Sequence, residues 1–315
     1  MKSLKIIVLL VVSLFIVAII FRCSNSEEYN YVENGVSSVY SEDNEDAQSN
    51  VKDSVVRDNT KESISYEKAK YNSVNLDASI IEEGLPNRLE IPRLVRLRAA
   101  QIIEHEGYTC SFNVDTKNSN WVAWRLTKEH ASGPWSRKGI QYMEDPLVVG
   151  QGQELSDWDY HNLSIDHGHM CPAGDNKWSE EAMVQTFYLT NMCPQNSNHN
   201  RGIWENLESR CRGWAKQYNE IFIVAGPIFY NDNYQTIGHN KVGVPDAFFK
   251  VVLCLTKKPK ALGFIFPNTT PEYSHIRDYL FSVDEVEEIA GIDFFYKLDD
   301  SIEEHVESTS ELPLW

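Results

Sequence analysis

The chain is organised around a stretch that opens with Asp166-His167-Gly168-His169-Met170-Cys171-Pro172. After an aromatic run it continues with Asn191-Met192-Cys193-Pro194-Gln195, and it closes with Asn200-Arg201-Gly202-Ile203-Trp204-Glu205-Asn206-Leu207-Glu208 and Arg212. Nowhere else in the sequence are His, Asn, Gln, Glu and Arg so concentrated among turn formers and apolar residues. Side chains of these types move protons and bind metals, so we expect the functional site within residues 166–212.

On both sides of this stretch, the apolar spacing predicts a mixture of helices and strands. Residues 200–218 carry apolar side chains at three- and four-residue intervals, which is typical of a helix. Residues 180–190 are expected to open as a helix and end as a strand, and Ser282 is expected to cap a helix that begins at Val283. Runs of aromatic and β-branched residues predict strands at 108–113, 121–126, 221–224 (ended by Gly226-Pro227), 248–255 and 262–266. Because helices and strands do not alternate regularly, an α+β fold is favoured over a doubly wound one.

The composition limits the possible classes of protein. The 315 residues leave room for one large domain or two small ones, and an apolar content of 42% is enough for a sizeable core. The formal net charge of −17 argues against a broad basic surface for nucleic acid. It does not exclude a narrow cleft in which a few Arg side chains contact phosphate, because the potential that matters there is local.

Residues 1–22 are predicted to be a targeting segment. Lys2 and Lys5 precede the apolar run 6–21, which suits a signal peptide and is short for a membrane-spanning helix of about 20 residues. The lysines are expected to stay in the cytoplasm, so the rest of the chain is predicted to be extracytoplasmic, either secreted, periplasmic or anchored to the membrane through this segment alone. A short uncleaved anchor is the alternative to cleavage. Cys23 adds lipid attachment as another alternative, although Phe21 and Arg22 are larger than the residues that usually precede a lipidated cysteine.

Residues 23–87 are predicted to be an acidic, disordered linker. Residues 24–87 contain 14 Asp and Glu against 5 Lys and Arg, and they show no periodic apolar face. Such a segment cannot bury enough surface to offset the entropy lost on ordering. The composition becomes globular after Gly84-Leu85-Pro86-Asn87, so one folded domain is expected over residues 88–315.

The cysteines leave the disulfide pattern open. Export permits disulfides. Without Cys23 the count is odd, so at least one thiol is expected to stay free or to pair between chains. The six cysteines are Cys23, Cys110, Cys171, Cys193, Cys211 and Cys254.

Three residues of the central stretch suit the hydrolysis of a phosphodiester, which needs a base to activate water and a cation to hold the charge of the leaving oxygen. A neutral His169 suits the first task, with Asp166 or a nearby carbonyl orienting its ring; the alternative is a histidine that only packs. Asn200 offers the oxygen ligand that Mg²⁺ prefers, or it is simply the N-cap of the following helix. Glu208, about two helical turns further on, suits a metal-bound water, and it is also placed for an i,i+4 ion pair with Arg212.

These motifs together resemble the DNA/RNA non-specific endonucleases of the Serratia nuclease type, in the His-Me finger (ββα-metal) group. The family pattern is Asp-Arg-Gly-His, then Asn-x-x-Pro-Gln, then Asn-x-Gly-x-Trp-x-x-Leu-Glu, and the blocks in residues 166–208 follow it in order. The resemblance covers roughly residues 90–300, with further matches at Trp121-Val122-Ala123-Trp124, Ala131-Ser132-Gly133 before Arg137, Val224-Ala225-Gly226-Pro227, Val244-Pro245 before Phe249-Lys250-Val251, and Ser282-Val283-Asp284-Glu285. It implies an antiparallel central sheet flanked by helices, with a ββα-metal active site.

The resemblance also implies roles for individual residues. His169 would activate the attacking water, and Asn200 would be the one direct protein ligand of a hydrated Mg²⁺, with Mn²⁺ as a possible substitute. Glu208 and Asn191 would support the waters of the metal and the site. Family members cleave DNA and RNA with little sequence preference and leave 5′-phosphate ends, so DNA and RNA are the implied substrates.

Two arginines are implied to neutralise the phosphate in the transition state, as bidentate donors suited to phosphate oxygens. They are Arg137 and Arg212. The loop that carries Arg137 differs in length from the usual form of the family.

One departure from the family pattern is His167, which replaces the Arg of Asp-Arg-Gly-His. If that Arg has a structural role, the site survives with a weaker phosphate or carboxylate contact. The alternative is a zinc site in which His167 and His169 are joined by His199 or a cysteine. A second class of function is a non-catalytic module that binds nucleic acid or another surface and keeps the fold; the presence of His169 and Asn200 favours the enzyme. Oligomeric state is not predicted.

Overall fold

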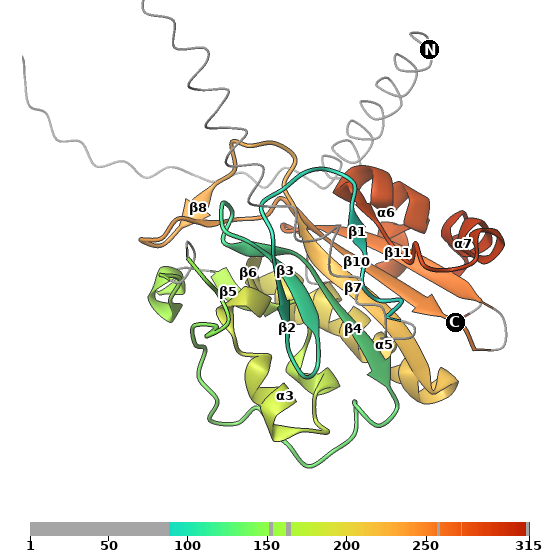
Figure 1. Cartoon of the computed structure of the whole chain (residues 1–315), viewed down its shortest axis with the longest axis horizontal. Helices are drawn as coiled ribbons and strands as arrows, with labels where there is room; N and C mark the ends of the chain where they lie inside the picture. Colours follow the sequence, from blue (N-terminus) through green and yellow to red (C-terminus); the bar gives the residue numbers. More distant parts are fainter. Residues whose placement is uncertain (1–87, 151–153, 162–164, 257–258, 272, 313–314) are drawn as a thin grey trace, which may run out of the picture. The chain divides into compact units, whose positions relative to one another are not determined.

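A central sheet of seven antiparallel strands carries the fold, in the order β12-β11-β10-β7-β4-β3-β2 (Figure 1). The computed structural model describes residues 88–315 except 151–153, 162–164, 257–258, 272 and 313–314, so the predicted leader 1–22 and linker 23–87 lie outside the described residues. The strands of this sheet are β2 (Gln101–Glu104), β3 (Thr109–Asn113), β4 (Asn118–Thr127), β7 (Glu220–Ile228), β10 (Ala247–Cys254), β11 (Lys260–Pro267) and β12 (Leu280–Phe281). The expected α+β fold with an antiparallel central sheet is confirmed.

Strand β10 shows why the sheet lies in the middle of the domain. All 8 of its residues are buried, and successive side chains of a strand point to opposite faces. Phe248 and Val252 belong to one apolar cluster, whereas Phe249 and Val251 belong to another. A sheet that is apolar on both faces needs a cover on both.

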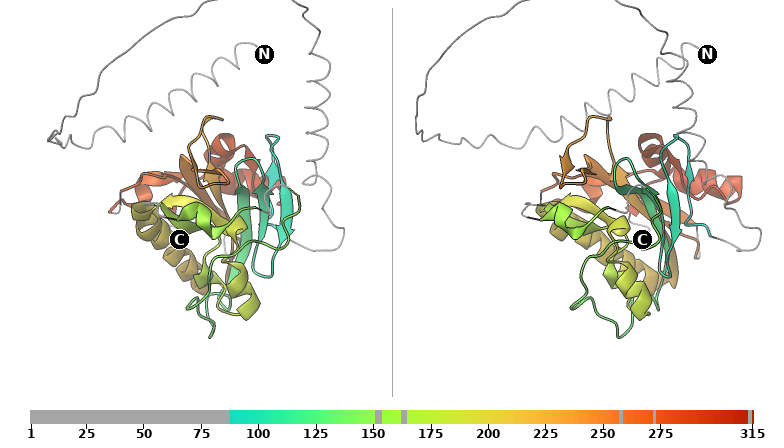
Figure 2. Two further views of the ribbon diagram at one scale, coloured as in Figure 1. Left: turned by 90° about the vertical axis from the view of Figure 1, so that its left-hand side faces the viewer. Right: turned by 60° about the vertical axis from the view of Figure 1, so that its left-hand side comes forward.

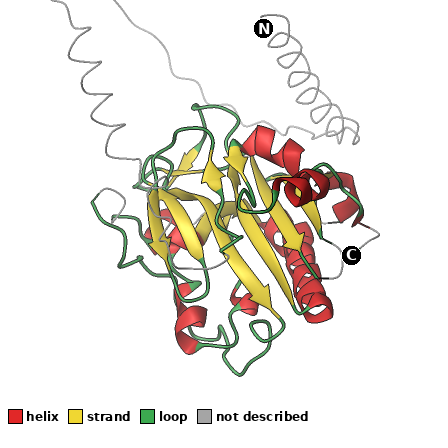
Figure 3. Cartoon of the chain, turned by 45° about the vertical axis from the view of Figure 1, so that its right-hand side comes forward, coloured by secondary structure: helices red, strands yellow, loops and turns green. Residues whose placement is uncertain are grey.

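Different helices cover the two faces, as Figures 2 and 3 show. Helix α5 (Glu205–Tyr218) contributes Leu207 to the first cluster. Helices α6 (Val283–Ala290) and α7 (Asp300–Glu307) contribute Val286 and Val306 to the second. Ser282 caps α6 as predicted, because its hydroxyl accepts a hydrogen bond from the Glu285 amide while the Glu285 carboxylate accepts one from the Ser282 amide.

A pair of strands lies on the same side of the sheet as α5, and α5 is the last part of a longer helix. Strand β5 (Ile165–His169) pairs with β6 (Met192–Asn196). Helix α4 (Ser197–His199), the π-helical turn η4 (Asn200–Trp204) and α5 then follow one another without a break. The predicted helix 200–218 is therefore present and starts three residues earlier, with Asn196 as its N-cap. Asn200 is not the cap but lies inside the helix.

Two predictions about where strands begin and end are wrong. The aromatic end of residues 180–190 forms the 3₁₀ turn η3 (Leu189–Asn191) instead of a strand, and the strand comes after it as β6. Gly226-Pro227 does not end β7; Pro227 stays in the strand, opposite Phe248. Gly226 is required there, because a Cβ atom would lie 2.6 Å from the Asn120 carbonyl oxygen.

The remaining elements are short. They are β1 (Arg93–Leu94) paired with β13 (Ile292–Asp293), β8 (Thr236–Ile237) paired with β9 (Val242–Gly243), α3 (Glu180–Gln185), and the 3₁₀ turns η1 (Asp157–Tyr160), η2 (Ala173–Asp175) and η5 (Ile276–Tyr279). Within the described part of the chain, no helix combines the length and apolar character needed to cross a bilayer.

Candidate active site

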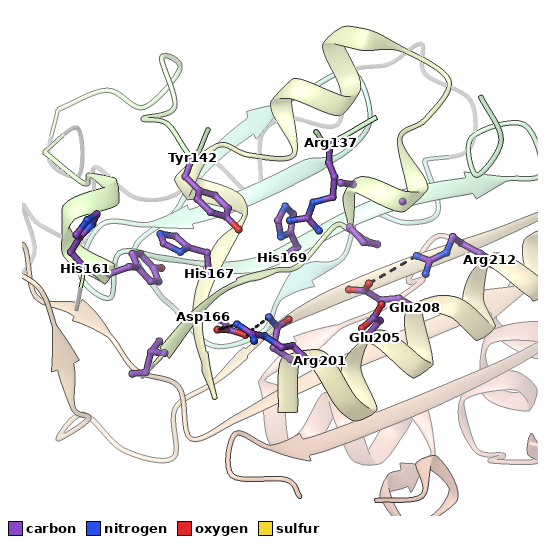
Figure 4. Close-up of a pocket in the computed structure, with 16 residues that line it drawn as sticks. Arg137, Tyr142, His161, Asp166, His167, His169, Arg201, Glu205, Glu208 and Arg212 are labelled. Carbon is purple, nitrogen blue, oxygen red and sulfur yellow. Dashed lines mark hydrogen bonds and ion pairs between the residues drawn. The ribbon is translucent and has the colours of Figure 1, made fainter. Parts of the chain in front are cut away.

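A cleft of about 790 Å³ is lined by residues of β5, η4 and α5 and by the loops around them (Figure 4). Its wall contains five of the six predicted site residues, namely Arg137, His169, Asn200, Glu208 and Arg212. The remaining lining residues are Tyr142, Tyr160, His161, Ile165, Asp166, His167, Pro172, Ala173, Gly174, Arg201 and Glu205. Residues that are 75 positions apart in the sequence therefore share one cavity.

His169 is the last residue of β5, and its imidazole is neutral at neutral pH. The residue is 8% exposed, and its Nε2 atom is buried without a hydrogen-bond partner among the described residues. Burial, followed by the positive charge of Arg137, lowers the pKa of His169 to about 3. The Trp204 indole donates a hydrogen bond to the His169 carbonyl oxygen over 3.0 Å and ties the strand to the helix. The ring thus offers an unprotonated, unpartnered nitrogen at the cleft.

Asn200 is held by Asp166. Its Nδ2 atom donates a hydrogen bond to Asp166 Oδ2 over 3.0 Å, so the carbonyl oxygen of this amide is the atom left for a ligand. Asp166 also accepts hydrogen bonds from Ser197 and from two nitrogens of Arg201. Although burial acts in the opposite direction, hydrogen bonds from Asn200, Arg201 and Ser197 hold the pKa of Asp166 below its usual value. Of the two groups expected to orient the His169 ring, Asp166 does not do so, because its oxygens accept hydrogen bonds from the helix. The nearby carbonyl does, since the ring hydrogen-bonds to the backbone of His167.

Glu208 and Arg212 form the other end of the cleft. Arg212 Nη1 lies 3.9 Å from a Glu208 oxygen, as the i,i+4 spacing predicted, and it donates a 3.1 Å hydrogen bond to the buried Asp175. Burial raises the pKa of Glu208 to about 7, and the nearby charge of Lys250 opposes this shift.

Lys250 is a charged residue that the sequence did not single out for the site. It is completely buried on β10, and its Nζ atom lies 3.9 Å from the centre of the Trp204 ring. The positive charge of Lys250 favours the ionised forms of Glu208 and Asp175, because an electrostatic interaction in the interior is weakly screened.

Arg137 comes from an exposed loop and reaches over the Phe187 ring, with 5.4 Å between the guanidinium carbon and the ring centre. It is drawn beside His169 in Figure 4. Arg137 and Arg212 therefore bring two positive groups to one cleft in a chain whose net charge is −17. This agrees with the expected narrow, local attraction for phosphate.

Asn191 is the one predicted residue that does not line the cleft. It is completely buried in η3, where Oδ1 accepts a hydrogen bond from the Cys171 amide and Nδ2 donates to the carbonyl oxygens of Cys171 and Thr186, each over 2.9 Å. Its amide oxygen and both amide hydrogens are engaged by the backbone, and the residue lies away from the cleft wall where a metal-bound water would be. Its contribution is to fix the backbone that follows His169.

Comparison with known proteins identifies the family. A family model described as DNA/RNA non-specific endonuclease matches residues 88–301. The chain belongs to this family.

The relatives of the chain are nucleases by name. It is 33% identical over 220 residues to nuclease EXOG, mitochondrial, from Mus musculus, which covers 65% of this chain and 60% of that protein. It is 29% identical to human endonuclease G, mitochondrial, over 62% of this chain and 69% of the relative. It is 33% identical to nuclease C1 of Cunninghamella echinulata var. echinulata, over 64% and 85%. The chain thus spans about 60% of the length of the EXOG relatives that it matches.

A solved structure supports the fold assignment. The crystal structure of the EndoG/EndoGI complex, which concerns the mechanism of EndoG inhibition, aligns with a TM-score of 0.58 and 26% sequence identity. The alignment covers 63% of this chain and 86% of that one.

His167, the departure from the family pattern, is held between two tyrosines. Its ring stacks on Tyr142 and on Tyr160, with 4.0 Å between ring centres in each case. Its Nε2 atom lies 2.9 Å from Asp157 Oδ1, and burial lowers its pKa although Asp157 acts in the opposite direction. The His167 ring thus fills the space between two aromatic rings at the position where the family pattern has Arg.

The alternative zinc site is not assembled. His199 is completely buried between aromatic rings, including Phe248 with 5.2 Å between ring centres. Among the described residues, the one group of three potential metal-binding side chains lies elsewhere and contains neither His167 nor His169. The five cysteines in the described part of the chain are all free and buried; Cys23 lies outside it.

Several residues of the cleft were missed by sequence analysis. Glu205 precedes Glu208 by three positions, so helical spacing could have placed it on the same face. Arg201 was expected only as part of a motif, yet it forms a bidentate contact with Asp166. Tyr142 lies in a loop without periodicity, and no sequence signal places it opposite His167.

We expect substitutions of Asn191 and Asn200 to differ in their effects on the free energy of unfolding. Asn191→Ala leaves three buried backbone groups without partners and should lower the free energy of unfolding by about 2 kcal/mol or more. Asn200→Ala should change it by about 0.5 kcal/mol or less, because Asp166 keeps Ser197 and Arg201 as donors. Urea unfolding of both variants measures the difference. Equal losses would show that Asn191 has no special role in fixing the backbone.

Proposed function

We propose that this chain is a metal-dependent endonuclease that hydrolyses phosphodiester bonds of DNA and RNA without sugar specificity and leaves 5′-phosphate ends. The observation that carries the proposal is the pairing, in one cleft, of the unprotonated His169 with the Asn200 amide, which Asp166 holds in place. Family membership and the names of the relatives support the same reaction class.

The polar side chains near Asn200 fit a hard divalent cation. Asn200 offers an amide oxygen, and Glu205 and Glu208 add carboxylates on the same wall, whereas no cysteine is among the described residues that line the cleft. Oxygen ligands of this kind suit Mg²⁺, and Mn²⁺ as a substitute, better than Zn²⁺. When bound, the cation supplies positive charge for the leaving 3′ oxygen. Asn200 would hold it directly, and Glu208 would hold its waters.

The other steps of the reaction are assigned to side chains of the protein. His169 Nε2 accepts the proton of the attacking water, because it is unprotonated and has no other partner among the described residues. Arg137 and Arg212 bind the phosphate oxygens from two sides. A phosphate that enters the cleft offsets the charge of Arg137, which raises the pKa of His169 and makes it a better base during the reaction.

Cleavage should require both the metal and His169. We expect the full chain to nick supercoiled plasmid and to degrade RNA with Mg²⁺, and to do neither with EDTA. His169→Ala should lower the rate about a hundredfold or more, the range for loss of a general base, while a gel and a thermal melt show an intact fold. His239→Ala, at an exposed histidine, is the matched control and should cleave normally. Undiminished cleavage by His169→Ala would refute the proposal, and a folded wild type that cuts neither substrate would favour the non-catalytic binding module.

The pH profile of kcat/KM tests the assignment of the base. The unprotonated imidazole is the active form, so activity is lost as pH falls through the pKa of His169. Because burial and Arg137 lower this pKa to about 3, the acid limb should lie below 6.5, the value of an ordinary histidine. Arg137→Gln removes a charge that lowers the pKa, so its acid limb should move to higher pH. An acid limb at an ordinary histidine pKa that Arg137→Gln leaves in place would contradict the assignment.

We also propose that the enzyme works outside the cytoplasm. The support is the sequence of residues 1–22, in which two lysines precede an apolar run. The names of the EXOG and endonuclease G relatives include the word mitochondrial, and this word refers to the location of those proteins. Fractionation of cells that express the full chain, with and without residues 1–22, should find it in the extracytoplasmic or membrane fraction only when the segment is present. Equal distribution of the two forms would overturn export.

A further inference from the structure

Three carboxylates converge on the side of the sheet that faces away from α5. Asp284 and Glu287 lie three residues apart on α6, and Glu307 is the last residue of α7. One oxygen atom from each side chain lies within 4.8 Å of the other two. These helices cover the second apolar cluster, so the carboxylate group is separate from the cleft, which lies on the side of the first.

Glu307 is the member that requires an explanation. It is 5% exposed, and its Oε1 atom is buried with no hydrogen-bond partner among the described residues. It also ends a helix, where the helix dipole disfavours a negative charge. Burying an ionised carboxylate without a partner is costly, so its position calls for a positive group.

The surroundings of the three carboxylates do not provide that positive group. Asp293 and Glu303 add further negative charge, and Arg93 already pairs with Asp293. Within the described part of the chain, no lysine or arginine forms an ion pair with Asp284, Glu287 or Glu307. Burial, together with the neighbouring carboxylates, raises the pKa of Glu307 to about 9.

We propose that Asp284, Glu287 and Glu307 bind a divalent cation of the calcium class, which ties α6 to α7. Ca²⁺ takes six to eight oxygen ligands in flexible geometry, whereas Mg²⁺ demands a tight octahedron. Glu287 is already oriented, because its Oε1 atom accepts a 2.6 Å hydrogen bond from the Phe294 amide. Asp284 is exposed, so water has access to complete the coordination sphere. The role of this cation is structural, since no residue of the cleft takes part.

Thermal unfolding of the full chain tests the site. In the wild type, saturating Ca²⁺ added after EDTA should raise the unfolding midpoint by about 5 °C. Glu307→Gln should unfold at about the same temperature as the wild type in EDTA, because without a cation Glu307 is largely protonated and Gln is an uncharged side chain of the same length. It should not respond to Ca²⁺. Glu288→Gln, at an exposed position on α6, is the matched control and should respond like the wild type. If Glu307→Gln does not fold, Asp284→Asn at the exposed position should show the same lost response.

The cleft must be excluded as the source of the response. Asn200→Ala should keep the full Ca²⁺ shift, and equilibrium dialysis of this variant with radioactive Ca²⁺ should show one bound ion that the further substitution Glu307→Gln removes. A wild type that does not respond to Ca²⁺ would overturn the proposal. A response that survives Glu307→Gln and disappears in Asn200→Ala would do the same, because the ion would then lie in the cleft.

Discussion

The carboxylate of Asp166 is the contact on which the candidate active site depends. It lies on β5, three residues before His169, and it accepts hydrogen bonds from Ser197, Asn200 and Arg201 at the start of the long helix. One side chain therefore joins the strand that carries the proposed base to the helix that carries the proposed metal ligand. Because these hydrogen bonds favour the charged form, Asp166 stays ionised, and the amide of Asn200 has one orientation.

The rest of the fold makes this short contact rigid. Trp204 adds a second connection between helix and strand through the His169 carbonyl oxygen, and Asn191 fixes the backbone beyond it. Behind both lies β10, whose buried Lys250 places a positive charge under Trp204. Burying polar groups costs free energy unless their partners are held in a fixed geometry. The sheet, which is covered by helices on both faces, holds these groups in place. The site can thus keep a neutral imidazole and a buried Glu208 with a raised pKa close to two arginines.

The sequence was sufficient for the parts of this structure that depend on local pattern. Periodicity predicted α5, Ser282 predicted the capped start of α6, and runs of aromatic and β-branched residues predicted the main strands. The motif order brought His169, Asn200 and Glu208 together correctly. Sequence was insufficient where long-range contacts decide: the partner of Asp166 is on a helix 31 to 35 residues away, Pro227 remains in a strand because its neighbours pair around it, and Tyr142 meets His167 through a loop. The carboxylates of α6 and α7 likewise meet only through tertiary packing.

The proposed reaction requires Asn200, oriented by Asp166, to bind a metal in the same cleft as the unprotonated His169. Anomalous diffraction from crystals soaked in Mn²⁺ would locate this ion without reference to activity. We expect a peak in the cleft at bonding distance from Asn200 Oδ1, with His169 Nε2 outside the coordination sphere. A peak bonded to the ring nitrogens of His167 or His169, or a cleft without a peak, would show that Asn200 is not the metal ligand.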